Sequence, residues 1–148
     1  MLMTPKQHAN KLIKKYNTND PFKIAKEKNI IVIFDDLEDI YGYYFSYKRV
    51  QFIHINNKLS ENDQRFVCAH ELGHSEQHPD KNTAYLSKHT LFSTDKLEIE
   101  ANKFAVDLLV PDESIVDLVR DGYTVEQIAL SFGIPKEFIG FKSFEEVL

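Results

Sequence analysis

Two histidines and a glutamate occur at a spacing that suits metal chemistry, in the stretch His70-Glu71-Leu72-Gly73-His74. If this stretch is helical, the two histidines lie about one turn apart on one face, so both imidazoles can reach one metal ion. Glu71 projects at a neighbouring angle and can meet a water molecule beside that ion. The pattern is typical of the metal-binding helix of metallopeptidases. Because so short a pattern also arises by chance, the rest of the chain has to support it.

A third metal ligand is needed, because a catalytic zinc site uses three protein ligands and keeps one position open for water. The next expected helix offers two acidic candidates, Glu98 and Glu100. Glu98 is the better one, because it lies beside small and amide residues that allow close approach to another helix. Glu100 points more than half a turn away, so both cannot easily bind one ion. Asn102, one turn beyond Glu98, could hydrogen-bond a ligand imidazole and orient it.

The chemistry expected of this set is hydrolysis of a peptide bond with the help of one catalytic zinc ion. Glu71 would accept the proton of the attacking water and pass it to the leaving amine. A donor for the developing oxyanion is usually needed as well. Tyr85 and His89, in the segment between the two expected metal-binding helices, are candidates by location, and surface or loop-packing roles are the alternative.

Three strands are expected before the first histidine. Their sequences are rich in aromatic and β-branched residues, and they cover Ile30 to Phe34, Tyr41 to Tyr47 and Val50 to Ile55. The pair Lys48-Arg49 is the expected turn of a hairpin between the last two strands, although it lacks the usual Asn-Gly signal.

Helices account for most of the remaining chain. Ser60 and Asp63 suit the cap and the acidic first turn of a long helix over about residues 61–77, and a second long helix is expected over roughly 95–110. Shorter helices are expected after Thr4-Pro5, after Asn19-Asp20-Pro21, after Pro111, and over Thr124 to Phe132 and Pro135 to Phe141. The prediction is an α+β fold, in which a small three-stranded sheet with a hairpin packs on a helical body.

Length and composition favour one folded domain, residues 1–148. The formal net charge of −5 leaves no basic footprint for nucleic acid, so no direct nucleic-acid binding is expected. Cys68 is the one cysteine, which excludes an intrachain disulfide. The longest apolar run is too short to span a membrane, and the lysine-rich start lacks the apolar core of a signal peptide. We therefore expect a cytoplasmic protein without a membrane partner.

Two separated segments together resemble the ImmA/IrrE family of metallopeptidases. The first is Val67-x-Ala69-His70-Glu71-Leu72-Gly73-His74, and the second is Glu98-x-Glu100-Ala101-Asn102-x-Phe104-Ala105-x-x-Leu108-Leu109-x-Pro111. Their order and separation make the resemblance far more specific than the first motif alone. The similarity extends from about Asn19 to about Pro111 and is looser beyond. It implies a catalytic core of about 20–111, followed by C-terminal helices over 112–148. It is strongest to the ImmA branch, whose members are short, cytoplasmic and encoded by mobile elements and phages.

The resemblance implies a gluzincin-like zinc site. At the matching positions, His70 and His74 are ligands, Glu71 is catalytic, Glu98 is the third ligand, and Asn102 is an orienting residue. It also implies a protein substrate, because ImmA-type enzymes cleave helix-turn-helix repressors and thereby release the genes of the element. The alternative is a regulator that keeps the metallopeptidase fold but acts by binding a partner without proteolysis. The intact Glu71 favours the enzyme.

Overall fold

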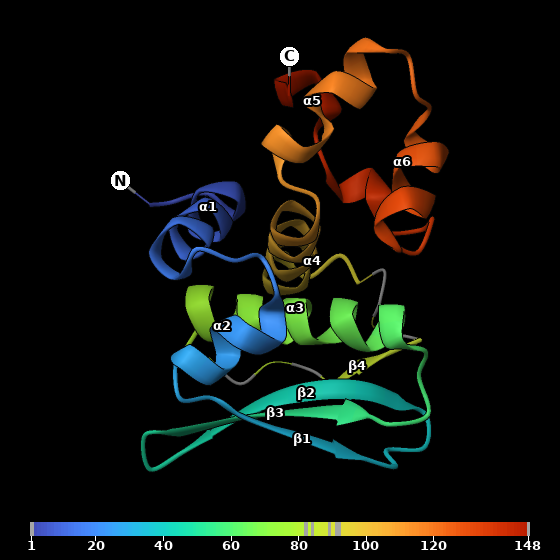
Figure 1. Ribbon diagram of the computed structural model, residues 1–148. Helices are drawn as coiled ribbons and strands as arrows, with labels where there is room; N and C mark the ends of the chain where they lie inside the picture. Colours follow the sequence, from blue (N-terminus) through green and yellow to red (C-terminus); the bar gives the residue numbers. More distant parts are fainter. Residues whose placement is uncertain (1, 82, 84, 89, 91–92, 148) are drawn as a thin grey trace.

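The computed structural model describes residues 2–81, 83, 85–88, 90 and 93–147. A small sheet forms one side of the molecule, and helix α3 lies along it with α2 beside α3 and near β1 (Figure 1). Helices α1, α4, α5 and α6 lie on the side of α3 away from the sheet. The helices are α1 (Pro5–Tyr16), α2 (Pro21–Glu27), α3 (Glu61–Gln77), α4 (Lys96–Leu109), α5 (Asp112–Arg120), α6 (Val125–Phe132) and the 3-10 helices η1 (Ile139–Phe141) and η2 (Phe144–Val147). The strands are β1 (Ile31–Asp35), β2 (Ile40–Tyr47), β3 (Val50–Asn56) and β4 (Leu86–Ser87). The α+β class expected from the sequence is confirmed.

The sheet has four strands in the order β1-β3-β2-β4, so the expectation of three was wrong. Strand β1 runs parallel to β3, whereas β2 is antiparallel to both β3 and β4. The additional strand is only two residues long, Leu86 and Ser87, and pairs with Ile40 and Gly42. Two residues are too few for the alternation of apolar and polar side chains that marks a strand, so long-range pairing alone defines β4.

The expected hairpin between β2 and β3 is present, with its turn at Lys48 and Arg49. Both residues have positive φ, 48° and 69°, as the common two-residue hairpin turn requires. Asparagine and glycine adopt this conformation most easily. Their absence explains why the turn signal in the sequence was weak.

Strand β2 approaches α3 closely at Gly42. A Cβ atom at this position would lie 2.5 Å from Val67 Cγ1 and 2.6 Å from the carbonyl oxygen of His54. Only glycine fits without a shift of the backbone. The close contact fixes α3 against the sheet one turn before the histidine pair.

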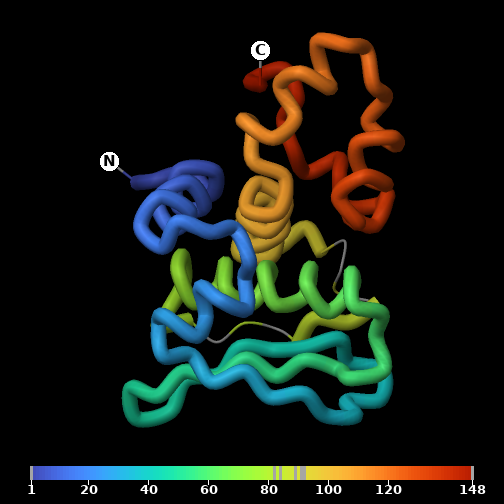
Figure 2. Tube along the Cα trace, in the orientation of Figure 1, coloured from blue at the N-terminus to red at the C-terminus, as the bar shows by residue number. Residues whose placement is uncertain are grey.

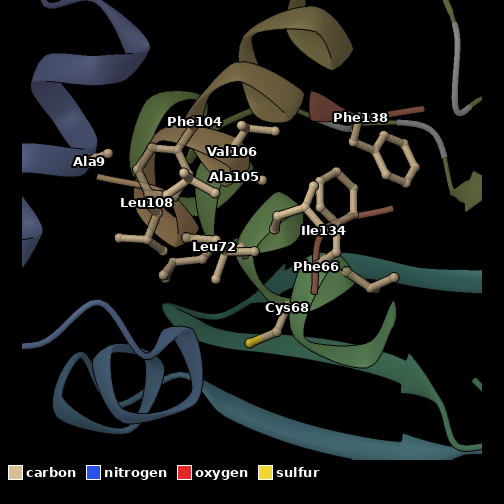
Figure 3. Close-up of a cluster of buried hydrophobic side chains, with 14 of the residues drawn as sticks. Ala9, Phe66, Cys68, Leu72, Phe104, Ala105, Val106, Leu108, Ile134 and Phe138 are labelled. Carbon is tan, nitrogen blue, oxygen red and sulfur yellow. The ribbon is translucent and has the colours of Figure 1, made fainter. Parts of the chain in front are cut away.

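Helix α3 is buried between the sheet and α4, and its residues 66–75 are all buried. Figure 3 shows Leu72 of α3 close to Phe104 and Leu108 of α4, with Ala9 of α1 beside them. Phe66 forms the other end of the cluster, where its ring stacks on Phe138 with centroids 4.0 Å apart. The long helix that carries the motif is therefore held on several sides by apolar packing.

In the C-terminal part, a short helix was expected over Pro135 to Phe141, and only the second half of this range is helical. Residues 136–138 form a turn, which is followed by the 3-10 helix η1. Gly133, in the left-handed conformation with φ 66°, ends α6. In the tube view of Figure 2, this red and orange part lies on the side of α4 away from the sheet. None of the helices in the described part of the chain is long and apolar enough to cross a membrane.

A buried lysine ties the C-terminal segment to the body. Lys142 is 4% exposed, and its Nζ donates hydrogen bonds to Asp107 of α4 at 2.9 Å and to Asp112 of α5 at 2.7 Å. Lys6 of α1 donates to the other oxygen of Asp112 at 3.2 Å. One ionic network thus joins α1, α4, α5 and the segment after η1.

The variant Lys142→Met should lower the free energy of unfolding by about 3 kcal/mol, because it leaves Asp107 buried without its cation. Lys136→Met, at an exposed position, is the matched control. Urea denaturation of both variants measures the difference. Equal stability of the two variants would contradict the stabilising role of the network.

Candidate metal centre

Helices α3 and α4 bring the sequence-predicted metal ligands together. Ser60 caps α3 by accepting a hydrogen bond from the backbone N–H of Asp63, and Asp95 caps α4 by accepting one from that of Leu97. The two helices pack directly against each other. The caps fix where each helix begins, and therefore which side chains face the contact between them.

The two imidazoles meet one carboxylate in the contact between the helices. Nε2 of His70 and Nε2 of His74 each lie 3.1 Å from the same oxygen, Oε1 of Glu98. Both histidines are fully buried, and Glu98 is 3% exposed. The structure therefore brings these three residues together, although they are separated by up to 28 positions in the sequence.

The other nitrogen of each imidazole also has a partner. Nδ1 of His70 lies 2.8 Å from Oδ1 of Asn102, which is buried one turn after Glu98 on α4. Nδ1 of His74 lies 3.3 Å from Nδ1 of His78. Both rings are thus held from the side away from Glu98.

Glu71 is fully buried beside this group, and neither of its carboxylate oxygens has a hydrogen-bond partner in the described part of the chain. Burial raises its pKa to about 7, although the charge of His70 acts in the opposite direction. A buried carboxylate without partners is costly unless a cation or a ligand compensates it. A bound metal ion would supply such a positive charge.

The pKa of Glu98 is shifted in the opposite direction to that of Glu71. Burial acts to raise its pKa, but the hydrogen bonds with His70 and His74 outweigh burial and hold the pKa at about 2. Burial lowers the pKa of His74. For His70, burial acts in the same direction, but the hydrogen bonds with Glu98 and Asn102 and the charges of Glu71 and Glu98 together outweigh it and raise the pKa. The carboxylate is therefore ionised and faces both Nε2 atoms.

The donor atoms suit a divalent cation. Three donors at about 2.0–2.1 Å from a tetrahedral ion lie about 3.3 Å from one another, close to the two 3.1 Å separations at Glu98. Donor atoms of His70, Glu71 and His74 also lie within 4.8 Å of one another. Two imidazoles with one of the two carboxylates can hold one metal ion, and nitrogen with carboxylate oxygen is a common zinc donor set.

The remaining candidates lie elsewhere. Glu100 faces His78, with 3.5 Å between its Oε1 and Nε2 of that histidine. Tyr85 is 56% exposed, and its ring packs against Tyr43 of β2 with centroids 4.8 Å apart. His89, the other expected oxyanion donor, lies outside the described residues.

The sequence analysis missed the contact between His78 and His74. The signal was present, because His70, His74 and His78 follow one another at four-residue spacing. The same spacing places His78 too far along a straight helix to share an ion with His70. It does place His78 beside the ring of His74.

Comparisons with known proteins identify the family of the chain. Residues 25–144 match the peptidase M78 family, described as the IrrE N-terminal-like domain. The chain is 42% identical over 143 residues to uncharacterized immunity region protein 2 of Bacillus phage phi105, covering 96% of this chain and 90% of the relative. It is 32% identical over 141 residues to metallopeptidase ImmA of Bacillus subtilis strain 168, covering 93% of this chain and 82% of the relative.

The class defined by the match and the site is that of the metallopeptidases. Within this class, the chain belongs to the ImmA/IrrE family. The match reaches residue 144, well past residue 111, where the resemblance in the sequence became looser.

Gly73, between Glu71 and His74, sets the distance between the two helices. A Cβ atom here would lie 2.9 Å from Cδ1 of the buried Phe104 ring. Gly73→Ala should therefore lower the free energy of unfolding by about 1–3 kcal/mol, despite the better helix propensity of alanine. Gly140→Ala is the control, because an added Cβ there meets nothing within 4 Å. Thermal denaturation that ranks the two variants equally would contradict the tight contact.

Proposed function

We propose that the protein is a zinc-dependent endopeptidase in which His70, His74 and Glu98 hold the ion and Glu71 acts as the general base. One observation carries the proposal. Two imidazole nitrogens converge on a single Glu98 oxygen at 3.1 Å in a buried site, and the partnerless carboxylate of Glu71 lies beside them. Membership of a metallopeptidase family supports it.

Glu98 is assigned as the third ligand in preference to Glu71. The Glu98 oxygen is equidistant from both Nε2 atoms, as a shared ion requires. Glu71 is adjacent to His70 in the sequence, so its side chain leaves the helix about 100° away from that imidazole. It is also the carboxylate whose oxygens have no hydrogen-bond partner in the described part of the chain, which leaves it able to receive a proton.

In the proposed reaction, the metal ion, Glu71 and Asn102 have separate roles. A bound zinc ion supplies Lewis acidity, which polarises the scissile carbonyl and makes a water molecule easier to deprotonate. Glu71 takes the proton of the attacking water on one of its carboxylate oxygens and delivers it to the leaving amine nitrogen. Oδ1 of Asn102 accepts a hydrogen bond from the Nδ1–H of His70, which leaves the lone pair on Nε2 directed toward the site.

The proposed substrate is a helix-turn-helix transcriptional repressor, whose cleavage releases the genes of a phage or mobile element. The sequence resemblance to the ImmA branch supports this substrate, as does a relative named as an immunity region protein of a phage. The reaction would take place in the cytoplasm, where such a repressor binds DNA. The whole chain acts as one unit in this proposal, because Lys142 bonds the C-terminal segment to α4.

A non-proteolytic regulator that keeps the fold and the metal is the second candidate. The burial of the site supports this candidate, because His70, Glu71 and His74 are all fully buried and not accessible to a substrate. A peptide would have to displace the residues that cover them before it could be cleaved. A variant that removes the carboxylate of Glu71 but keeps the metal distinguishes the two functions, because only an enzyme would lose activity.

The variant Glu71→Gln should abolish cleavage of the repressor encoded beside the gene, with a fall in rate of about 10²- to 10⁴-fold, because the proton acceptor is lost. Its zinc content should stay at one ion per chain, since Glu71 is not a ligand. Glu113→Gln, at an exposed position on α5, is the control and should cleave normally. Equal activity of both variants would exclude Glu71 as the base, and an inactive wild type with bound zinc would favour the regulator.

The choice of third ligand is tested by zinc competition with a chromogenic chelator. Glu98→Gln should weaken zinc binding by on the order of 100-fold or more, because it removes a charged ligand. Glu100→Gln should change the affinity little, because Glu100 faces His78 and keeps a hydrogen-bond acceptor in the variant. The reverse ranking would show that Glu100 is the ligand.

A further inference from the structure

His78, at the end of α3, contacts the proposed metal ligand His74 from behind. The two Nδ1 atoms are 3.3 Å apart, and His78 is 8% exposed. On its other side, Nε2 of His78 lies 3.5 Å from Oε1 of Glu100, which is a close contact but longer than a regular hydrogen bond. Glu100, His78 and His74 thus form a row that ends at the metal centre.

The protonation pattern along this row follows from the use of His74 as a ligand. A neutral imidazole that offers the lone pair of Nε2 to a metal carries its proton on Nδ1. For His70, this proton is donated to Oδ1 of Asn102. For His74, the acceptor at hydrogen-bond distance is Nδ1 of His78. His78 then carries its own proton on Nε2, which faces the carboxylate of Glu100.

We propose that His78, held by Glu100, is the positioning residue of His74, as Asn102 is of His70. This inference rests on the proposed function, in which His74 is a metal ligand. His78 acts only through His74 and does not touch the ion, because it contacts the Nδ1 side of that ring, and Nε2 faces Glu98. Outer partners of this kind fix the orientation and the tautomer of a ligand histidine and strengthen metal binding.

A role in ending the helix does not account for this side chain. The C-cap of α3 uses the backbone N–H of His78, which donates to the carbonyl oxygen of His74 at 2.7 Å. Any residue other than proline can supply that bond. The imidazole is buried in addition, between a ligand histidine and a carboxylate.

The experiment compares four variants of the full chain with the wild type. His78→Leu removes the acceptor, whereas His78→Gln keeps an acceptor oxygen of similar reach. Glu100→Leu removes the anchor from the partly exposed end of the row. His54→Leu, on the sheet, is the matched control for loss of a histidine. Zinc affinity is measured by competition with a chelator, and the ligand field is read from the visible spectrum of the cobalt-substituted protein.

His78→Leu should weaken zinc binding by about 10- to 100-fold and shift the cobalt bands. His78→Gln should restore most of the affinity and the wild-type spectrum, and Glu100→Leu should give a smaller loss than His78→Leu. His54→Leu should match the wild type. Thermal unfolding of the metal-free proteins should rank His78→Leu and His78→Gln together, so that a difference in affinity between them is not one of folding.

Unchanged affinity and an unchanged cobalt spectrum in His78→Leu would overturn the inference and leave the proposed function intact. A loss that His78→Gln does not restore, with an equal fall in metal-free stability, would assign His78 a structural role and overturn it as well. If His78→Leu does not fold, Glu100→Leu decides, and wild-type affinity in that variant overturns the inference. A wild-type protein that binds neither zinc nor cobalt would overturn the proposed function together with the inference.

Discussion

Two imidazoles and two carboxylates meet inside this protein, and the cost of burying them is the constraint on which the rest of the structure depends. Charged and polar groups removed from water need partners, or they destabilise the fold. Glu98 has both histidines as partners, and Asn102 and His78 hold the far sides of those rings. Glu71 is left without a hydrogen bond in the described part of the chain. The buried group can therefore accept a cation, and the carboxylate of Glu71 can accept a proton.

The surrounding packing keeps these atoms at fixed distances. Gly73 lets α4 approach α3 against the ring of Phe104, and Gly42 lets the sheet approach α3 from the other side. Because α3 is buried on both sides, its histidines cannot turn away from α4 without disturbing the core. Lys142 fastens the C-terminal segment to α4, the helix that carries Glu98 and Asn102. The same contacts that stabilise the fold therefore preserve the geometry of the site.

Helical periodicity made it predictable that His70, His74 and Glu98 can lie close together. The four-residue step from His70 to His74 and the preference for Glu98 over Glu100 both follow from which face of a helix a residue occupies. Features that depend on contacts between distant segments were not accessible in this way. The strand at Leu86 exists only through its partner strand, and the burial of Lys142 was not predictable because a lysine is usually exposed and its two acidic partners lie far away in the sequence. The use of His78 depends on how two rings turn toward each other, which spacing alone does not determine.

The most direct test of the central assignment is anomalous diffraction at the zinc absorption edge from crystals grown with zinc. One strong peak is expected, within bonding distance of Nε2 of His70, Nε2 of His74 and a carboxylate oxygen of Glu98, at about 2.0–2.2 Å. Glu71 should lie near the ion without binding it directly. A peak bound by Glu71 in place of Glu98, or no peak between α3 and α4, would contradict the assignment.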